Sequence, residues 1–135
     1  MPDNFETTIN TIVLDTEAKL LAVTRQSIQD LVDDIQTPVA KGGKMRVKTG
    51  FLRASGLSSL NAPPAGPSRG ESDKQYVYSG DPINITLGQM EIGDIFYWGW
   101  TAAYARHREA FDGFLESGLQ KWQTYVDANV RKLKS

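Results

Sequence analysis

The chain has 135 residues, with 15 basic residues, 16 acidic residues, one histidine and no cysteine. This length suits one domain, and a hydrophobic fraction of 40% is enough for a core, which excludes a chain disordered throughout. Without cysteine the chain has no disulfide, thiolate metal site or cysteine nucleophile, and one histidine cannot form a multi-histidine zinc site. We therefore expect a single domain over residues 1–135 that is not an enzyme and has no catalytic, cofactor-binding or metal-binding residues.

The net charge of −1 conceals a strong segregation of charge along the chain. Residues 1–40 hold seven acidic and two basic residues, whereas residues 41–53 hold five basic residues and no acidic one. The five are Lys41, Lys44, Arg46, Lys48 and Arg53. Blocks of opposite sign in a short chain favour contacts between subunits over a uniform DNA-binding face. We expect this basic cluster to contact a neighbouring subunit, with weak contact to DNA in a channel as the alternative.

The first predicted element is a long helix over residues 1–36, because no glycine or proline interrupts the pattern between Asp3 and Pro38. Its apolar residues cover an arc of roughly 200°, about twice what a helix resting on one surface needs. The helix would also be about 50 Å long, which exceeds the size of a compact chain of this length. We expect its second apolar face to contact another subunit, through residues that include Ile12, Leu21 and Val32.

The middle of the chain is predicted to be a loop followed by strands. Residues 37–56 form the basic loop and a short helical turn, and residues 57–100 form antiparallel strands that include a mobile loop over 62–73. The second and third strands are expected to form a hairpin. The predicted strands are Leu57–Asn61, Gln75–Tyr78, Ile83–Leu87 and Asp94–Trp100.

The last predicted element is an amphipathic helix over residues 112–133. The expected fold class is therefore α+β, in which a long N-terminal helix and a C-terminal helix pack on a three- to four-stranded antiparallel sheet. Within the last strand, alternation places Phe96, Trp98 and Trp100 on one face, which we expect to be the core face.

Arg106, His107 and Arg108 form a second basic group, followed by Glu109. A histidine beside a carboxylate is a candidate for general acid–base catalysis. The two arginines disfavour the imidazolium form of His107, however, and no nucleophile is placed beside it by spacing. We expect these three residues to lie at a subunit or partner interface.

The segment from Met45 to Ser55 resembles a motif of phage tail-completion proteins, also called neck or head–tail joining proteins, from long-tailed double-stranded DNA phages. That family carries Pro-Val-Asp-Thr-Gly-x-Leu-Arg-x-Ser after a long N-terminal helix. Here Arg46 replaces the proline and Lys48 replaces the aspartate. A second, looser match surrounds the Tyr-Ala pair that ends a strand in the family. The matching residues are Val47, Thr49, Gly50, Leu52, Arg53, Ser55, Tyr104, Ala105 and Glu109.

The resemblance implies a structural virion protein that forms a ring, a hexamer or a dodecamer, at the head–tail junction or tail top. The implied partners are head-completion or connector proteins and tail-tube or tail-terminator proteins, with assembly in the host cytoplasm. Independently of the resemblance, the chemistry of these residues predicts local roles. Thr49 can cap the short helix, Gly50 permits an unusual backbone and Leu52 can anchor in the core. No membrane partner is expected, because no apolar stretch reaches about 20 residues. The alternative is a small cytoplasmic binding or regulatory module that dimerises through the N-terminal helix.

Overall fold

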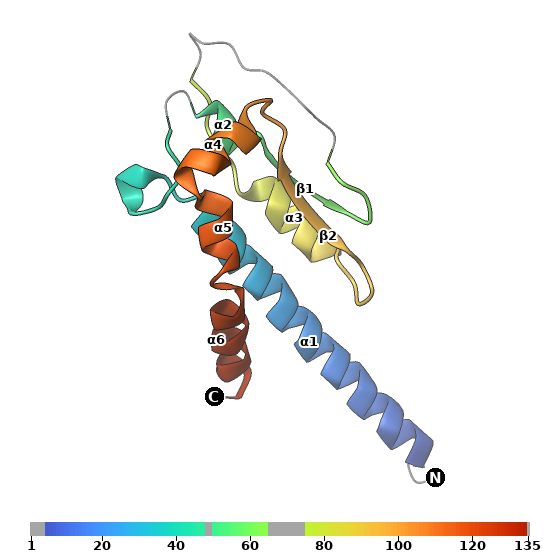
Figure 1. Cartoon of the computed structure of the whole chain (residues 1–135). Helices are drawn as coiled ribbons and strands as arrows, with labels where there is room; N and C mark the ends of the chain where they lie inside the picture. Colours follow the sequence, from blue (N-terminus) through green and yellow to red (C-terminus); the bar gives the residue numbers. More distant parts are fainter. Residues whose placement is uncertain (1–4, 48–49, 65–74, 135) are drawn as a thin grey trace.

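The computed structural model describes residues 5–47, 50–64 and 75–134, and all structural statements concern these residues (Figure 1). The longest element is the helix α1, Phe5–Ile35. Its C-terminal half packs against α3, α5 and α6, while its N-terminal half extends away from the other elements (Figure 1). No described helix combines the length and the apolar character that a membrane span requires. The remaining elements are η1 (Val39–Lys41), α2 (Phe51–Ala54), β1 (Gly56–Leu60), α3 (Asp81–Gln89), β2 (Phe96–Trp100), α4 (Ala105–Asp112), α5 (Phe114–Leu119) and α6 (Trp122–Lys134).

The combination of a long N-terminal helix, a C-terminal helix and an antiparallel sheet is confirmed, but the predicted number of strands is wrong. The described residues contain a two-stranded sheet in which β1 pairs with β2, with Gly56 opposite Trp100 and Leu60 opposite Phe96. Residues 75–78 form no strand, so the predicted hairpin is also absent from this part of the chain. Most of the loop expected over 62–73 lies outside the described residues.

The segment predicted as a strand over Ile83–Leu87 is the middle of α3. Its apolar residues occupy positions 83, 85 and 87, which fits a strand, but positions 83 and 87 also fit one face of a helix. The structure buries Ile83 and Leu87 and leaves Ile85 59% exposed, and this burial pattern is the one expected for a helix. Pro82 in the first turn and Asp81 beside it suit a helix N-terminus.

The predicted C-terminal helix over residues 112–133 is two helices, α5 and α6, and a further helix, α4, precedes them. Gly113 separates α4 from α5 with φ at 66°, a left-handed conformation that glycine adopts without steric cost. The carboxylate of Glu109 accepts hydrogen bonds from the backbone N–H groups of Leu115 and Glu116, at 2.8 and 3.1 Å. These bonds satisfy donors that the start of α5 would otherwise leave without partners. A second break follows Leu119, where residues 120–121 form a turn before α6.

Two clusters of buried side chains form the core. One lies between α1, α3 and the sheet, and the other lies between α2, α5 and the segment after β2. Phe96 and Trp98 pack against the first cluster and Trp100 packs against the second, so the predicted core face of this strand is confirmed. Trp98 and Trp100 meet edge to face, with ring centroids 6.0 Å apart, which joins the two clusters. The buried members are Ile28, Val32, Ile83, Leu87 and Met90 in the first cluster and Met45, Leu52, Ala102 and Phe114 in the second.

Candidate subunit interface

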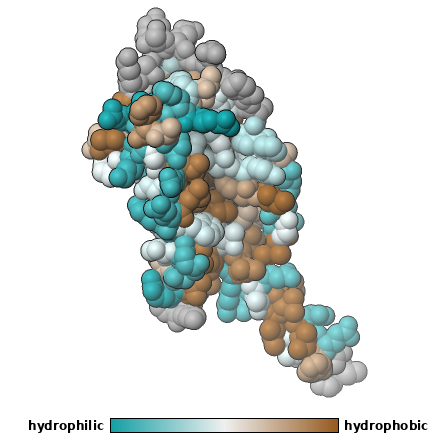
Figure 2. Space-filling model, in the orientation of Figure 1, coloured by the Kyte–Doolittle hydropathy of each residue, from teal (hydrophilic) through white to brown (hydrophobic). Residues whose placement is uncertain are grey.

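The N-terminal half of α1 carries a series of exposed large apolar side chains. Every residue from Phe5 to Leu20 is exposed, and the first buried residue of the helix is Val23. We call Phe5–Leu20 the projecting segment. Figure 2 shows apolar residues at the end of this segment with hydrophilic residues beside them. Its exposed large apolar residues are Phe5, Ile9, Ile12, Val13, Leu14 and Leu20.

Most of these side chains form one stripe. At 100° per residue, Phe5, Ile9, Ile12, Val13 and Leu20 fall within an arc of about 100°. Glu6 and Glu17 follow one edge of the stripe, and the ion pair between Asp15 and Lys19, with a nitrogen–oxygen distance of 3.0 Å, follows the other. The projecting segment thus presents an apolar stripe on a helix surface of net negative charge.

The three residues of this helix that were predicted to contact a neighbour have different environments. Ile12 is 55% exposed on the projecting segment, and Leu21 is partly buried where that segment meets the body. The prediction for Val32 is wrong, because this side chain is 1% exposed and belongs to the core cluster with Ile83 and Leu87. The wide apolar arc of α1 therefore serves the core in the C-terminal half and faces solvent in the N-terminal half.

The basic loop is held in place by backbone bonds and by one buried side chain. Val39 N donates to Met45 O at 2.9 Å, and Gly43 N donates to Pro38 O at 3.0 Å. Met45 is fully buried in the core cluster around Leu52. With these anchors the loop turns its charged residues outward, so Lys41, Lys44 and Arg46 are exposed.

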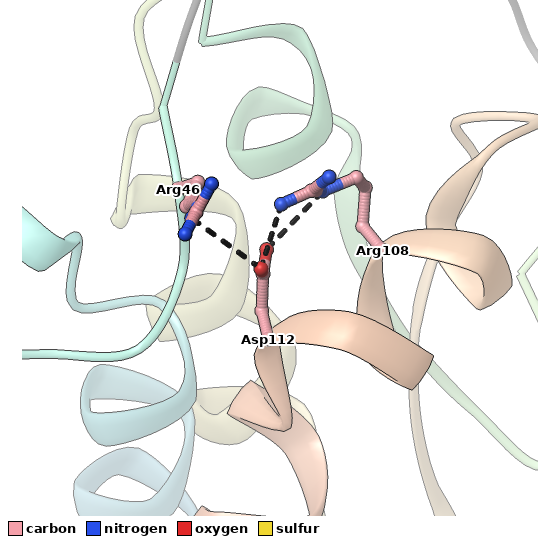
Figure 3. A network of polar contacts seen from close by, with 3 residues as sticks. All are labelled: Arg46, Arg108 and Asp112. Carbon is pink, nitrogen blue, oxygen red and sulfur yellow. Dashed lines mark hydrogen bonds and ion pairs between the residues drawn. The ribbon is translucent and has the colours of Figure 1, made fainter.

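The structure brings this loop to the second basic group, which lies on α4 (Figure 3). Asp112 accepts two hydrogen bonds from Arg108, at 2.6 and 3.2 Å, and its Oδ1 atom lies 3.7 Å from Nε of Arg46. The Asp112 side chain is 4% exposed and that of Arg46 is 75% exposed. One buried carboxylate therefore faces two guanidinium groups and leaves a positive excess at the surface. We call Lys41, Lys44, Arg46, Arg106, His107 and Arg108 the basic surface.

Exposed apolar groups lie among these charges. Phe111 is 73% exposed, with the ring of His107 at 5.0 Å and the guanidinium of Arg108 at 6.0 Å from its ring. On the loop side, Val39 and Val47 are each about half exposed. Figure 2 shows brown and teal atoms mixed over the region of η1 and α4. The basic surface therefore combines positive charge with exposed aromatic and aliphatic groups.

Arg53, also predicted to lie at an interface, points to the interior of this chain. Its Nε donates to Gln36 O at 2.7 Å, and its guanidinium stacks on the ring of Tyr78 at 5.0 Å. Lys48 and Thr49 lie outside the described residues, so neither the proposed contact of Lys48 nor the cap by Thr49 has a structural description.

Several residues of the family-like motif have local structural roles. Gly50 has φ at 84°, and a Cβ atom there would lie 2.1 Å from the carbonyl oxygen of Tyr76, so the expected unusual backbone is confirmed. Leu52 is buried as expected. Ser55 Oγ donates to Leu52 O and accepts from Ala102 N, which joins α2 to the end of β2. Val47 and Tyr104 are exposed, whereas Ala105 begins α4 and packs on the second core cluster.

The contact between α1 and α6 is polar, which the sequence pattern did not predict. Asn129 donates to Ser27 at 3.1 Å and to Asp30 at 3.0 Å, and Ser27 and Asn129 are both buried. Tyr125 Oη donates to Asp34 at 2.5 Å, while Lys121 lies 3.4 Å from the same carboxylate. Burial and the neighbouring Asp34 carboxylate raise the pKa of Tyr125 well above its ordinary value. A signal was present in the sequence, since Ser27 and Asn129 both interrupt apolar stripes.

The described residues contain no group of three or more histidine, cysteine, aspartate or glutamate side chains placed to hold a metal ion. No family model, curated protein sequence or solved structure matches this chain. The projecting segment and the basic surface are therefore interpreted from their own geometry and charge.

Proposed function

We propose that this chain is a structural subunit of a phage or phage-like particle, which assembles into a ring at the head–tail junction or tail top. The observation that supports it most is the projecting segment, in which sixteen consecutive helical residues are exposed and five form an apolar stripe. Monomeric proteins rarely leave such a stripe uncovered. The motif around Gly50 to Ser55 supplies the link to tail-completion proteins. Under this proposal the chain acts by shape and contact and not as an enzyme.

The size of the stripe bears on how many contacts a stable assembly needs. Full burial of a large apolar side chain is worth about 1.5–3 kcal/mol, so covering five half-exposed ones supplies about 4–8 kcal/mol. Association itself costs about 4–15 kcal/mol. The stripe alone therefore roughly balances the cost of association, and a stable complex needs a further surface. A ring subunit has such further surfaces, because each copy contacts two neighbours.

The proposed partners are further copies of the chain, in a hexamer or dodecamer, together with head-completion or connector proteins and tail-tube or tail-terminator proteins. Weak contact between the basic surface and DNA in the channel is the alternative to contact with a neighbouring subunit. The proposed location is the virion, after assembly in the host cytoplasm.

The test is the stoichiometry of the full chain, measured by native mass spectrometry and by electron microscopy, alone and with portal-proximal and tail-tube proteins. We expect a ring of six or twelve copies, either for the chain alone or once these partners are added. A protein that remains a 15.0 kDa monomer under all of these conditions contradicts the proposal.

A second candidate, a small binding or regulatory module that dimerises through α1, is supported by the geometry of the same stripe. In an antiparallel pair of projecting segments the two apolar stripes would face each other, with Phe5 of one copy opposite Leu20 of the other. The same measurement separates the two candidates, because this one yields two copies under every condition.

A further inference from the structure

We infer that the projecting segment of one copy docks on the basic surface of the next copy, so that the contact is head to tail. The inference rests on the proposed ring and names the two surfaces that would build it. The occupant of the basic surface is a second copy of this chain, and the argument combines charge, apolar character and position.

The two surfaces have complementary charge. Around the projecting segment, Glu6 and Glu17 border the stripe, and the one lysine, Lys19, is already paired with Asp15. On the basic surface, Asp112 is buried between Arg46 and Arg108 and cannot neutralise both. Lys41, Lys44 and Arg106 add further exposed positive charge. An incoming helix edged with carboxylates would supply the missing negative charge and would steer the two surfaces together.

The apolar groups decide between a protein and DNA as the occupant. A DNA backbone offers phosphates, and basic side chains are sufficient to bind them without any apolar group. The basic surface also exposes Phe111 and the aliphatic residues Val39 and Val47. Contact with other apolar side chains stabilises such exposed groups. A neighbouring copy would provide these contacts through its Phe5, Ile9 and Ile12. The mixture of charged and apolar groups therefore favours the amphipathic helix over the duplex.

The positions of the two surfaces favour a head-to-tail contact. Figure 1 shows the N-terminus of α1 at one extremity of the molecule, while η1 and α4 lie beyond the opposite end of α1. One chain therefore cannot place its own projecting segment on its own basic surface. A contact between two different surfaces repeats from copy to copy, and it forms a ring when the rotation closes.

Charge-swap variants provide the first test. Variant A carries Glu6→Lys and Glu17→Lys, and variant B carries Lys44→Glu and Arg106→Glu; all four residues are exposed. We expect each variant alone to self-associate at least about tenfold more weakly than the parent chain in light scattering. A mixture of A and B, and one chain with all four changes, should recover assembly, because both restore opposite charges at every contact. A control pair on α6, Asp127→Lys with Arg131→Glu, should assemble like the parent.

The absence of cysteine makes cross-linking a direct second test. A chain with Ile9→Cys and Phe111→Cys should form disulfides between copies and give a ladder of covalent oligomers that ends at the ring number. A chain with Ile9→Cys and Ile85→Cys, whose second position is another exposed apolar residue, on α3, should give no ladder. Circular dichroism of each variant confirms that it folds.

Three outcomes overturn the inference. If A and B both form rings like the parent, the ring is retained and its contact lies elsewhere. An apolar groove of about 280 Å³ lies between α1 and the segment before β2, and Ile92→Lys changes it. If this variant abolishes assembly while A and B do not, the projecting segment occupies that groove. If B assembles normally but loses retention of double-stranded DNA, the basic surface serves DNA. A parent chain that never exceeds a dimer, alone or with the portal-proximal and tail-tube proteins, contradicts the proposed ring itself.

Discussion

Gln36, which directly follows α1, and Arg53 in α2 exchange two hydrogen bonds. Arg53 Nε donates to Gln36 O at 2.7 Å, and Gln36 Nε2 donates to Arg53 O at 2.8 Å. Gln36 Oε1 also accepts from Trp100 Nε1 at 2.7 Å. One buried side chain at the end of α1 thus fixes the positions of α2 and β2, and the basic loop between α1 and α2 is held at both ends.

We predict that Gln36→Ala lowers the free energy of unfolding by about 2–4 kcal/mol. The change leaves the Trp100 indole N–H and the Arg53 carbonyl without their partner, at about 1–3 kcal/mol for each buried polar group. Urea unfolding followed by tryptophan fluorescence measures the loss. Gln26→Ala is the control, because Gln26 makes an exposed bond to Asp30 and should cost less than about 0.5 kcal/mol. Equal effects at the two positions would contradict the role of Gln36.

Asp112→Ala should destabilise the protein by about 2–3 kcal/mol, because a hydrogen-bonded, mostly buried charge pair loses one member. Urea unfolding at two salt concentrations checks this prediction. The loss should change little with salt, since buried pairs are weakly screened. Asp127→Ala removes an exposed carboxylate that accepts from Gln123, and it should have almost no effect. A similar loss in both variants would mean that the pairing of Asp112 with Arg108 contributes no particular stability.

Gly118→Ala should destabilise the protein by about 1–3 kcal/mol, because the new Cβ atom would lie 2.2 Å from Ile35 Cγ2 in the contact between α5 and α1. Thermal unfolding monitored by circular dichroism measures the effect. Gly88→Ala is the matched control, since Gly88 also lies in a helix but a Cβ there meets nothing within 4 Å. That variant should be more stable than the parent by about 0.5–1 kcal/mol. A neutral Gly118 variant would show that α5 and α1 can move apart.

Ile12→Ala and Val32→Ala should differ strongly although both residues belong to one helix. Val32 is buried, and its truncation should cost about 2 kcal/mol. Ile12 is 55% exposed, and its truncation should cost the folded monomer less than about 0.5 kcal/mol. Urea unfolding at low protein concentration, where assembly does not contribute, makes the comparison. A large loss at Ile12 in the monomer would show that the projecting segment packs within its own chain.

The pKa of Tyr125 predicts a weakening of the fold at alkaline pH. Burial and the Asp34 carboxylate raise this pKa above its ordinary value of 10.0, so the folded state keeps a proton that the unfolded state releases. The stabilisation is fully present below pH of about 10 and is lost as the pH rises further. In urea unfolding from neutral to alkaline pH, Tyr125→Phe should therefore lose less stability with rising pH than the parent. Parallel curves for the two proteins would contradict this assignment.

The N-terminal helix and both strands of the observed sheet were predictable, but the direct pairing of these strands and the helix between them were not. The run without glycine or proline before Pro38 predicts α1 directly, and the structure has this helix over Phe5–Ile35. For Ile83–Leu87, strand and helix patterns both fit five residues, and burial of Ile83 and Leu87 against α1 and the sheet decided for the helix. The predicted C-terminal helix began at residue 112, beside the observed break at Gly113, but the break after Leu119 was missed because the apolar stripe continues past it.

The sequence alone determined that α1 is amphipathic over its whole length and that acidic and basic residues lie in separate blocks. Helix formation and net charge are local properties, so a pattern over a few turns is sufficient. Only the tertiary structure decided that Val32 is core and Ile12 is surface, and that Arg53 turns inward while Arg46 joins Arg108 at Asp112. Burial and ion pairing depend on which distant segment lies opposite a side chain. The elements α3, α5, α6 and the sheet cover the C-terminal half of α1. No described element covers its N-terminal half.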